Sequence, residues 1–241
     1  MRGRTAARPL AEIAAAAGHV FTAKGFRSAG ISDVSAALGL SHGALYTYVD
    51  SKQALLYLAL RHALQPETVD DLLRPVSEPP QEIMALVESW ATSQRGFQAF
   101  IEAITRPSTR PVAQELGDII DELYDFIERN RHILALIAAC ATDLPELAQW
   151  YFVQRRRAML EHLGGYLHQR IGEGQLPPVP DAPTAARFIV ETIAWFAMHR
   201  HGDPDSAMLD DRTSRQTVHH LLTAAFLPAT KTTPEYRKPR L

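Results

Sequence analysis

Apolar residues recur at helical spacing along most of the 241-residue chain, and no stretch alternates apolar and polar positions as a half-buried strand does. A clear stripe near the N-terminus ends at Lys24-Gly25, a typical helix stop. Its members are Leu10, Ile13, Ala14, Ala17, Val20 and Phe21. This spacing predicts an all-α fold.

Three shorter helices are predicted after this stripe. The first ends at Gly39, the next begins at Ser41, and the third is capped by Asp50 or Ser51 and runs to about Gln65. Longer helical patterns follow, separated by loops rich in proline and glycine. They cover about 80–105, 112–128, 131–142, 144–171, 184–200 and 210–227. Residues 228–241 lack periodicity, and we expect them to be disordered.

Charge divides the chain in the same way as the helical pattern. The formal net charge is only −2, which taken alone argues against a nucleic-acid partner. Residues 1–65, however, carry seven basic and three acidic residues, whereas residues 66–227 carry 14 arginines and 23 acids. Residues 228–241 have a net charge of +3. This division favours a small basic head that meets a polyanion and a large acidic body that does not.

The segment 25–52 has the local signals of a helix-turn-helix. Gly39 suits a left-handed helix end, and Ser41 suits the N-cap of the next helix. Small residues at Gly43 and Ala44 would let the start of that helix approach a DNA groove closely. Lys52 opens the following helix, where a cation and the helix dipole together favour a phosphate.

These residues resemble the DNA-binding domain of the TetR family of bacterial transcriptional regulators. The matching stretches are Gly25-Phe26, Asp33-Val34, Gly39-Leu40-Ser41, Gly43-Ala44-Leu45-Tyr46-Thr47-Tyr48 and Ser51-Lys52. The chain departs from the family at Gly30, where Thr or Ser usually caps the second helix, and at Val49, which replaces a Phe. The resemblance implies a repressor that binds a palindromic operator on double-stranded DNA as a homodimer and is released by a small molecule.

The resemblance also implies a division of the chain. Residues 1–52 would form a three-helix DNA-binding domain, and the helix to about residue 65 would link it to the body. Residues 53–227 would form a larger helical domain for ligand binding and dimerisation, followed by the tail 228–241. The DNA-binding residues are then expected to be Arg27, Ser32, Ser41, His42, Gly43, Ala44, Tyr46, Thr47, Tyr48 and Lys52. Tyr46 and Lys52 would bind phosphates, while His42, Ala44 and Thr47 would read base edges. Arg2, Arg4 and Arg8 form either a minor-groove arm or a plain mobile terminus.

The last helices offer a candidate dimer interface, because the family pairs its final two helices with those of a second copy. The expected residues are Gly164, Gly165, Ile189, Ile193, Phe196, Val218, Leu221 and Leu222. Ordinary burial within one subunit is the alternative. The two glycines lie inside a helix, where each costs about 1 kcal/mol relative to alanine, and a close helix crossing would account for them.

Aromatic residues in the body offer a candidate site for a partly apolar effector, with polar neighbours to orient it. The expected residues are Trp90, Gln94, Phe97, Tyr124, Tyr151, Arg155, Trp195 and His199. Each of the aromatic residues could instead belong to the core.

Other classes of function find little support in the sequence. The histidines lack metal-ligand spacing, and no phosphate loop or nucleophile motif appears, so we expect no metal, no cofactor and no enzyme. The single cysteine, Cys140, lies on an apolar face, and we expect a cytoplasmic protein without a membrane span. Two alternatives remain open. One is an all-α small-molecule-binding or enzyme-like protein without a DNA function, and the other is a DNA-binding regulator that is constitutive or controlled by a partner protein.

Overall fold

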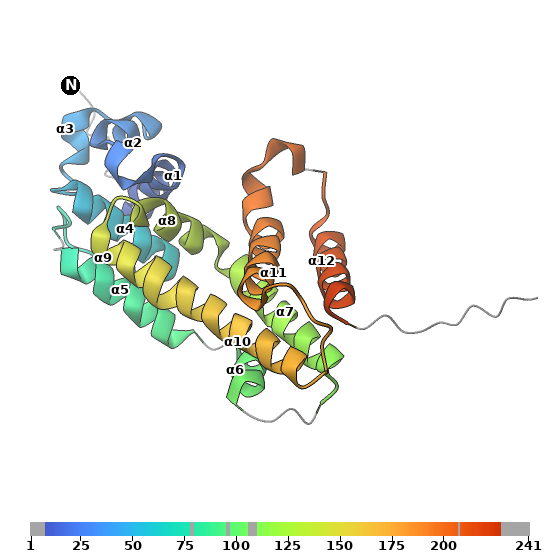
Figure 1. Cartoon of the computed structure of the whole chain (residues 1–241). Coiled ribbons are helices and arrows are strands. Elements are labelled where there is room, and N and C mark those ends of the chain that lie inside the picture. Colours follow the sequence, from blue (N-terminus) through green and yellow to red (C-terminus); the bar gives the residue numbers. More distant parts are fainter. Residues whose placement is uncertain (1–7, 78–79, 95–96, 106–109, 207, 228–241) are drawn as a thin grey trace, which may run out of the picture. The chain divides into compact units, whose positions relative to one another are not determined.

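The computed structural model describes residues 8–77, 80–94, 97–105, 110–206 and 208–227 (Figure 1). The predicted basic tail and the arm residues Arg2 and Arg4 lie outside these ranges. The regular elements of the described residues are helices, which confirms the all-α prediction. The chain divides into two compact units. None of the described helices is long and apolar enough to cross a membrane.

Unit 1 comprises residues 1–96 and 126–159 and contains the predicted DNA-binding segment. Two of its short elements are a 3₁₀ turn at Pro66–Thr68 and a π-helical stretch at Gln149–Arg157. Its α-helices are α1 (Leu10–Ser28), α2 (Ile31–Ala37), α3 (His42–Leu45), α4 (Lys52–Leu64), α5 (Pro80–Ser93), α8 (Arg131–Ala141) and α9 (Pro145–Ala148).

The core of unit 1 is built around α4. Every residue from Ala54 to Leu60 is buried, because α1, α5 and α8 all pack against this helix. A helix surrounded on all sides must be apolar on all sides, and the sequence ALLYLAL meets that demand. Helix α1 also packs against α8. The head is therefore joined to the rest of unit 1 by a continuous apolar core rather than by a linker.

Unit 2 comprises residues 97–125 and 160–241. Its helices are α6 (Gln98–Thr105), most of α7 (Val112–Arg129), most of α10 (Ala158–Gly172), α11 (Ala182–Ala197) and α12 (Asp211–Phe226). Helices α11 and α12 lie side by side as a hairpin (Figure 1). Their connection is held by the buried Arg200 guanidinium, which donates to the carbonyl oxygens of Phe196 and Leu209 and pairs with Asp211.

A buried ion pair lies at the centre of unit 2. The Arg170 side chain is fully buried, and its Nε and Nη2 donate to the two carboxylate oxygens of Glu115 at 2.7 and 3.2 Å. Arg170 also donates to the Ala103 carbonyl and to Glu173. This arrangement ties α10 to α6 and α7 through a charge that cannot be left unpaired without a large cost.

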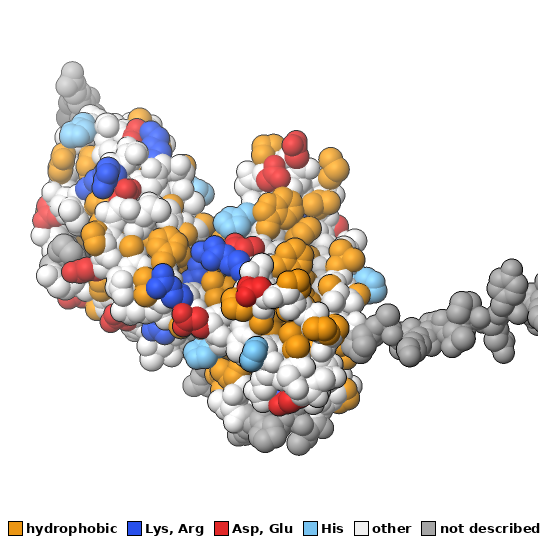
Figure 2. Space-filling model, viewed as in Figure 1, with side chains coloured by type: hydrophobic (Ala, Val, Ile, Leu, Met, Phe, Trp, Pro, Cys, Tyr) orange, Lys and Arg blue, Asp and Glu red, His pale blue; other side chains and the backbone are white. Residues whose placement is uncertain are grey.

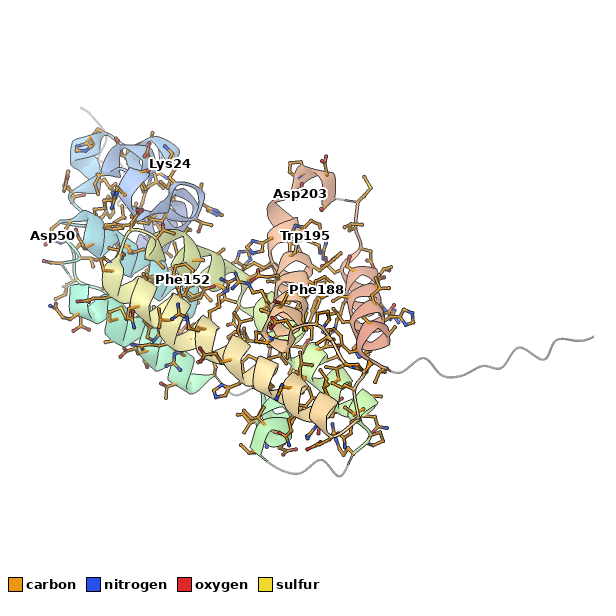
Figure 3. All side chains as sticks on the ribbon, viewed as in Figure 1. Lys24, Asp50, Phe152, Phe188, Trp195 and Asp203 are labelled. Atoms are coloured by element: carbon orange, nitrogen blue, oxygen red, sulfur yellow. The ribbon has the colours of Figure 1, made fainter. Side chains whose placement is uncertain are left out.

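The α11–α12 hairpin also carries large apolar side chains on its outside. Phe188 is 57% exposed, Trp195 is 38% exposed and Leu221 is 60% exposed. Figure 2 shows hydrophobic side chains gathered over α11 and α12. Phe188 and Trp195 are seven residues apart and project from one face of α11 (Figure 3).

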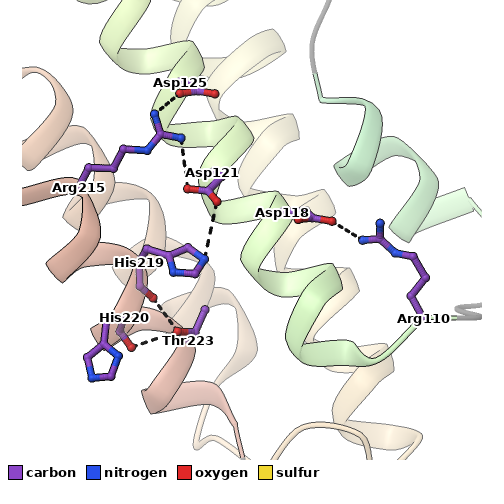
Figure 4. A network of polar contacts seen from close by, with 8 residues as sticks. All are labelled: Arg110, Asp118, Asp121, Asp125, Arg215, His219, His220 and Thr223. Carbon is purple, nitrogen blue, oxygen red and sulfur yellow. Dashed lines mark hydrogen bonds and ion pairs between the residues drawn. The ribbon is translucent and has the colours of Figure 1, made fainter. Parts of the chain in front are cut away.

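A polar network fixes α12 against α7 within unit 2. Arg215 pairs with Asp121, at 3.2 Å, and with Asp125, while the His219 Nε2 lies 3.8 Å from Asp121 Oδ2 (Figure 4). A Cβ at Gly117 would lie 3.1 Å from the same His219 Nε2. The absence of a side chain at Gly117 therefore lets the imidazole approach α7.

The prediction of a single helix over 80–105 is wrong. Helix α5 ends at Ser93, and α6 begins at Gln98 after Phe97, whose φ of 61° interrupts any helix. The Glu122 carboxylate accepts the backbone N–H groups of Ala99 and Phe100, as an N-capping residue does. Because this cap comes from a different helix, the local sequence pattern did not reveal the break.

The long helix predicted from Leu144 to Ile171 is confirmed in its extent, with Pro145 in its first turn and its end at Gly172. Nine residues in its N-terminal half, 149–157, are π-helical, which the 3.6-residue period had not indicated.

Burial of Cys140 leads to a simple chemical prediction. The thiol is buried on α8, and burial, together with the nearby Asp143, raises its pKa to about 12. Because the thiolate is the reactive species, the folded protein should resist alkylation by iodoacetamide at pH 8. In denaturant the same residue should react at the rate of a free cysteine. Mass spectrometry of both samples measures the difference, and rapid labelling of the native chain would contradict the described burial.

Candidate nucleic-acid interface

Gly30 is the N-cap residue of α2, and Asp33 stabilises this helix start. The Gly30 N–H donates to Asp33 Oδ2 at 2.8 Å, and the Lys24 ammonium lies 2.9 Å from Asp33 Oδ1. The Lys24 hydrogen bond, and after it the Gly30 N–H, hold the pKa of the Asp33 carboxyl below its ordinary value. The carboxylate thus does part of the capping at a helix start that lacks the usual Thr or Ser side chain.

The turn between α2 and α3 has the geometry of a helix-turn-helix. Gly39 has a φ of 64°, and the Leu40 N–H donates to the Ser35 carbonyl at 2.8 Å, which closes the end of α2. Ser41 then caps α3 as predicted, because its hydroxyl accepts the Ala44 N–H at 3.2 Å. Helix α3 is short, and Tyr46, Thr47 and Tyr48 follow it in a turn.

The first turn of α3 is open on its outer face. Ser41, His42, Gly43 and Thr47 are exposed, and a Cβ at Gly43 would meet no atom within 4 Å. On the opposite face Leu45 is fully buried and anchors the helix in the core.

The side chains around this turn differ in the fraction of their surface that is exposed to solvent. Tyr46 is 44% exposed and makes an edge contact with the His42 ring at 5.3 Å between centroids. Tyr48 is only 8% exposed, and its hydroxyl accepts the Arg8 N–H at 3.0 Å. Tyr48 therefore joins the residues before α1 to the turn after α3 and presents little surface to solvent. Ala44 is half-buried, and Ser32 is exposed on α2.

Lys52 joins the start of α4 to the end of α1. Its ammonium donates to the Arg27 carbonyl at 3.0 Å and lies 4.7 Å from the centre of the Phe26 ring. Ser51 caps α4 by accepting the Ala54 N–H at 2.9 Å. Lys52 is thus held at the N-terminus of α4, where the helix dipole adds to its own charge.

The end of α1 is also fixed by α8 and by the turn that follows it. Asp143 accepts the Arg27 N–H at 2.6 Å, and its other oxygen lies 3.7 Å from Arg27 Nε. Gly25, with a φ of 73°, kinks the helix, and a Cβ there would lie 3.2 Å from both the Ala139 carbonyl and the Asp143 carboxylate. The Arg27 side chain nevertheless remains 82% exposed.

The residues predicted for effector binding fall into two groups. Unit 1 holds Trp90, Gln94, Tyr151 and Arg155, and unit 2 holds Phe97, Tyr124, Trp195 and His199. Trp90 stacks on Phe126 at 6.4 Å, the Arg155 guanidinium lies over the Trp150 ring, and the Arg215 guanidinium lies over the buried Tyr124 ring. Two surface hollows in unit 2, of about 420 and 360 Å³, are lined by none of these eight residues.

The residues predicted for dimerisation differ in exposure. Ile189, Ile193, Val218 and Leu222 are buried within the chain itself, whereas Leu221 is exposed and Phe196 is half-buried. A Cβ at Gly164 would lie 3.5 Å from Pro183 Cα, so this glycine permits a close approach between α10 and the start of α11. Gly165 is exposed and has no such neighbour.

Two residues with exposed side chains were not singled out by the sequence patterns. Phe188 lies off the apolar stripe of α11, so its exposure is visible only in the folded hairpin. Arg74 lies in a proline-rich loop, yet its guanidinium is 5.4 Å from the centre of the Tyr48 ring. No helical period indicates such a loop contact. Among the described residues there is no cluster of three or more side chains suited to a metal ion.

Residues 10–57 match the family model described as "Bacterial regulatory proteins, tetR family". No curated protein matches the chain. Solved structures resemble it in fold, among them the ketosteroid transcriptional regulator KstR2 of Mycobacterium tuberculosis, with 17% identity and a TM-score of 0.55. That match covers 94% of this chain and 98% of KstR2.

A second similar structure is AibR in complex with isovaleryl coenzyme A and operator DNA, with 12% identity and a TM-score of 0.50. The match covers 89% of this chain and 97% of AibR. A third is the TetR family transcriptional regulator PfmR from Thermus thermophilus, with 23% identity over 88% of this chain and 97% of PfmR, and a TM-score of 0.46.

Proposed function

We propose that the chain is a member of the tetR family of bacterial regulatory proteins, whose model residues 10–57 match, and that it acts as a homodimeric repressor whose two heads bind a palindromic operator. A small-molecule effector then releases the protein from DNA. The observation that carries this proposal is the open outer face of α3, which follows a helix-turn-helix bend and presents small and hydrogen-bonding residues together.

The α3 face suits a major groove for a steric and a chemical reason. Gly43 and Ala44 let the helix backbone come close to the base edges, and the His42 ring and Thr47 hydroxyl offer hydrogen-bonding groups at that depth. The Tyr46 hydroxyl and the Lys52 ammonium would then bind phosphates, which fix the position of the head on the duplex. Tyr48 has a supporting role, because its hydroxyl accepts the Arg8 N–H and so holds the segment before α1 in place.

Replacing Lys52 with alanine should weaken DNA binding by a similar factor on all sequences, because a phosphate contact carries no base information. The slope of log K against log salt concentration should become shallower by about one unit. Fluorescence anisotropy with an operator duplex and with a mixed-sequence duplex, over a range of KCl concentrations, measures both quantities. A change in sequence preference would contradict the assigned role.

Dimerisation is proposed because one short recognition helix contacts few base pairs, so a single head gives little specificity. The exposed apolar residues of the α11–α12 hairpin, Phe188, Trp195 and Leu221, provide a surface that a second copy would cover. A two-fold dimer built there would present two heads to two half-sites, spaced by one helical turn of about 34 Å or by a multiple of it.

Release by an effector is proposed as a population shift. A small molecule that binds better to a dimer with more widely spaced heads reduces DNA affinity by no more than the ratio of its affinities for the two states. The fold likeness to AibR, described with isovaleryl coenzyme A, makes short-chain acyl-coenzyme A thioesters the first compounds to test. Adding each thioester to the anisotropy assay identifies an effector by the loss of bound DNA.

We further propose that the protein acts in the cytoplasm and is not an enzyme. One alternative is an all-α ligand-binding or enzyme-like protein whose basic head has no DNA function. The other is a DNA-binding regulator that is constitutive or controlled by a partner protein. A gel shift with DNA flanking the protein's own gene separates the first alternative from the lead proposal. The effector titration separates the second.

A further inference from the structure

A loop outside the helix-turn-helix runs across the head. Residues 69–77, here called the strap, follow α4 and the 3₁₀ turn after it. The Val76 N–H donates to the Tyr48 carbonyl at 2.8 Å, and the Asp50 N–H donates to the Val76 carbonyl at 3.1 Å. At its other end, Asp70 accepts the Ala11 N–H at 3.2 Å in the first turn of α1. The strap is therefore bonded both to the segment that follows the recognition helix and to the start of α1.

These bonds place one cation at the edge of the recognition helix. The Arg74 side chain is exposed, and its guanidinium lies 5.4 Å from the centre of the Tyr48 ring. Tyr48 in turn accepts a hydrogen bond from the backbone of Arg8, the last of the three arginines near the N-terminus. Arg8 and Arg74, far apart in the sequence, thus both lie next to Tyr48.

Arg74 differs from the other cations of this region in having no polar partner. Within residues 8–77, all of which the structure describes, five basic side chains are engaged with carboxylate, carbonyl or hydroxyl oxygens. Arg8 pairs with Glu12, Lys24 with Asp33, Arg27 with Asp143, Lys52 with the Arg27 carbonyl, and Arg61 with Tyr57 and Thr68. Arg74 makes no hydrogen bond or ion pair within the described part of the chain, so the only partner recorded for its guanidinium is the Tyr48 ring.

We propose that Arg74 is a phosphate-binding residue of the DNA interface, held beside the recognition helix by the strap. The inference rests on the proposed DNA-binding function and extends the interface beyond the family-matched residues 10–57. A guanidinium presents five donors in a fork that matches phosphate oxygens, and an aromatic ring beneath it fixes its plane without consuming a donor. The other cations must first give up or share an oxygen partner, whereas Arg74 has none to give up.

The size of the expected effect follows from counterion release. One lost phosphate contact changes the slope of log K against log salt concentration by about 0.9. At a salt concentration of about 0.1 M, this corresponds to a loss of DNA affinity of about five- to tenfold. The loss should be similar for every duplex, because the contact is to the backbone.

The experiment compares the wild-type full-length chain with Arg74→Gln, Arg74→Lys and a matched control. Arg157→Gln is the control, because it removes the same charge from an exposed residue of the π-helical stretch. Each protein is titrated by fluorescence anisotropy into a labelled duplex from the region upstream of its gene and into a mixed-sequence duplex, from 50 to 300 mM KCl. Thermal unfolding of each variant reports whether the strap still holds.

The proposal predicts that Arg74→Gln lowers affinity about five- to tenfold on both duplexes, with a shallower salt slope and an unchanged unfolding temperature. Arg74→Lys should retain most of the salt slope, and Arg157→Gln should bind as wild type does. Binding by Arg74→Gln within twofold of wild type, or a loss equal to that of Arg157→Gln, overturns the inference and leaves the DNA-binding proposal standing. Salt-insensitive or absent binding by the wild-type chain overturns both.

Discussion

Replacing Leu221 with glutamate is expected to lower operator affinity by about 100-fold or more. Leu221 is 60% exposed on α12, so the change should cost the folded monomer little. In the proposed dimer the same carboxylate would be buried without a partner, at a cost of several kcal/mol. About 3 kcal/mol corresponds to roughly 100-fold in dissociation constant. A monomer with one head would then lose the second half-site.

Light scattering and sedimentation measure the oligomeric state of this variant, and anisotropy measures its DNA affinity. Gln216→Glu is the matched control, because Gln216 is exposed on another face of the same helix. The control should remain a dimer with wild-type affinity. If the Leu221→Glu protein is still a dimer, Leu221 does not lie in the dimer interface and the proposed interface is wrong.

Replacing Glu115 with leucine is expected to lower the free energy of unfolding by about 3–5 kcal/mol. The variant leaves the fully buried Arg170 guanidinium without its main carboxylate partner, because Glu115 supplies both oxygens of the bidentate pair. Glu173, the second partner, is 41% exposed at its side chain and cannot replace a buried carboxylate.

Urea unfolding followed by circular dichroism measures this loss. The double variant Glu115→Leu with Arg170→Met should recover most of the stability, because it removes both charges and keeps apolar volume in place. Glu173→Gln serves as the control and should cost no more than about 1 kcal/mol, as expected for an exposed ion-pair partner. An equal loss for the single and double variants would show that packing, rather than the unpaired charge, accounts for the cost.

The sequence predicted the head well because its signals are local. The hydroxyls of Ser41 and Ser51 each accept a backbone N–H three residues ahead, and Gly39 adopts the left-handed conformation that its position required. Each of these interactions spans a few residues, so the pattern of residue types is enough to identify it.

The parts that the sequence did not predict depend on residues far apart in the chain. The start of α6 is fixed by Glu122, which lies more than twenty residues away. The strap lies across the head through Tyr48, Asp50 and Ala11, and nothing in its own composition indicates those partners. The sequence also did not predict which apolar residues of the α11–α12 hairpin are buried and which are exposed, because that depends on how the two helices pack.

Part of the basic charge of the head is neutralised by carboxylates within the folded chain. Residues 1–65 have an excess of basic residues in the sequence, but Lys24 and Arg27 are each paired with a carboxylate in the folded chain. Phosphates must compete with those internal partners. Arg74, which the sequence arithmetic assigned to the acidic body, lies beside the recognition helix instead.

Titration of the wild-type chain into a labelled duplex from its own upstream region, between 50 and 300 mM KCl, tests the central claim most directly. The account predicts tight binding at low salt, a decline of log K that is linear in log salt concentration, and weaker binding to a mixed-sequence duplex of the same length. Absence of binding at 50 mM KCl, or binding that does not change with salt, would contradict a DNA-binding function for the head.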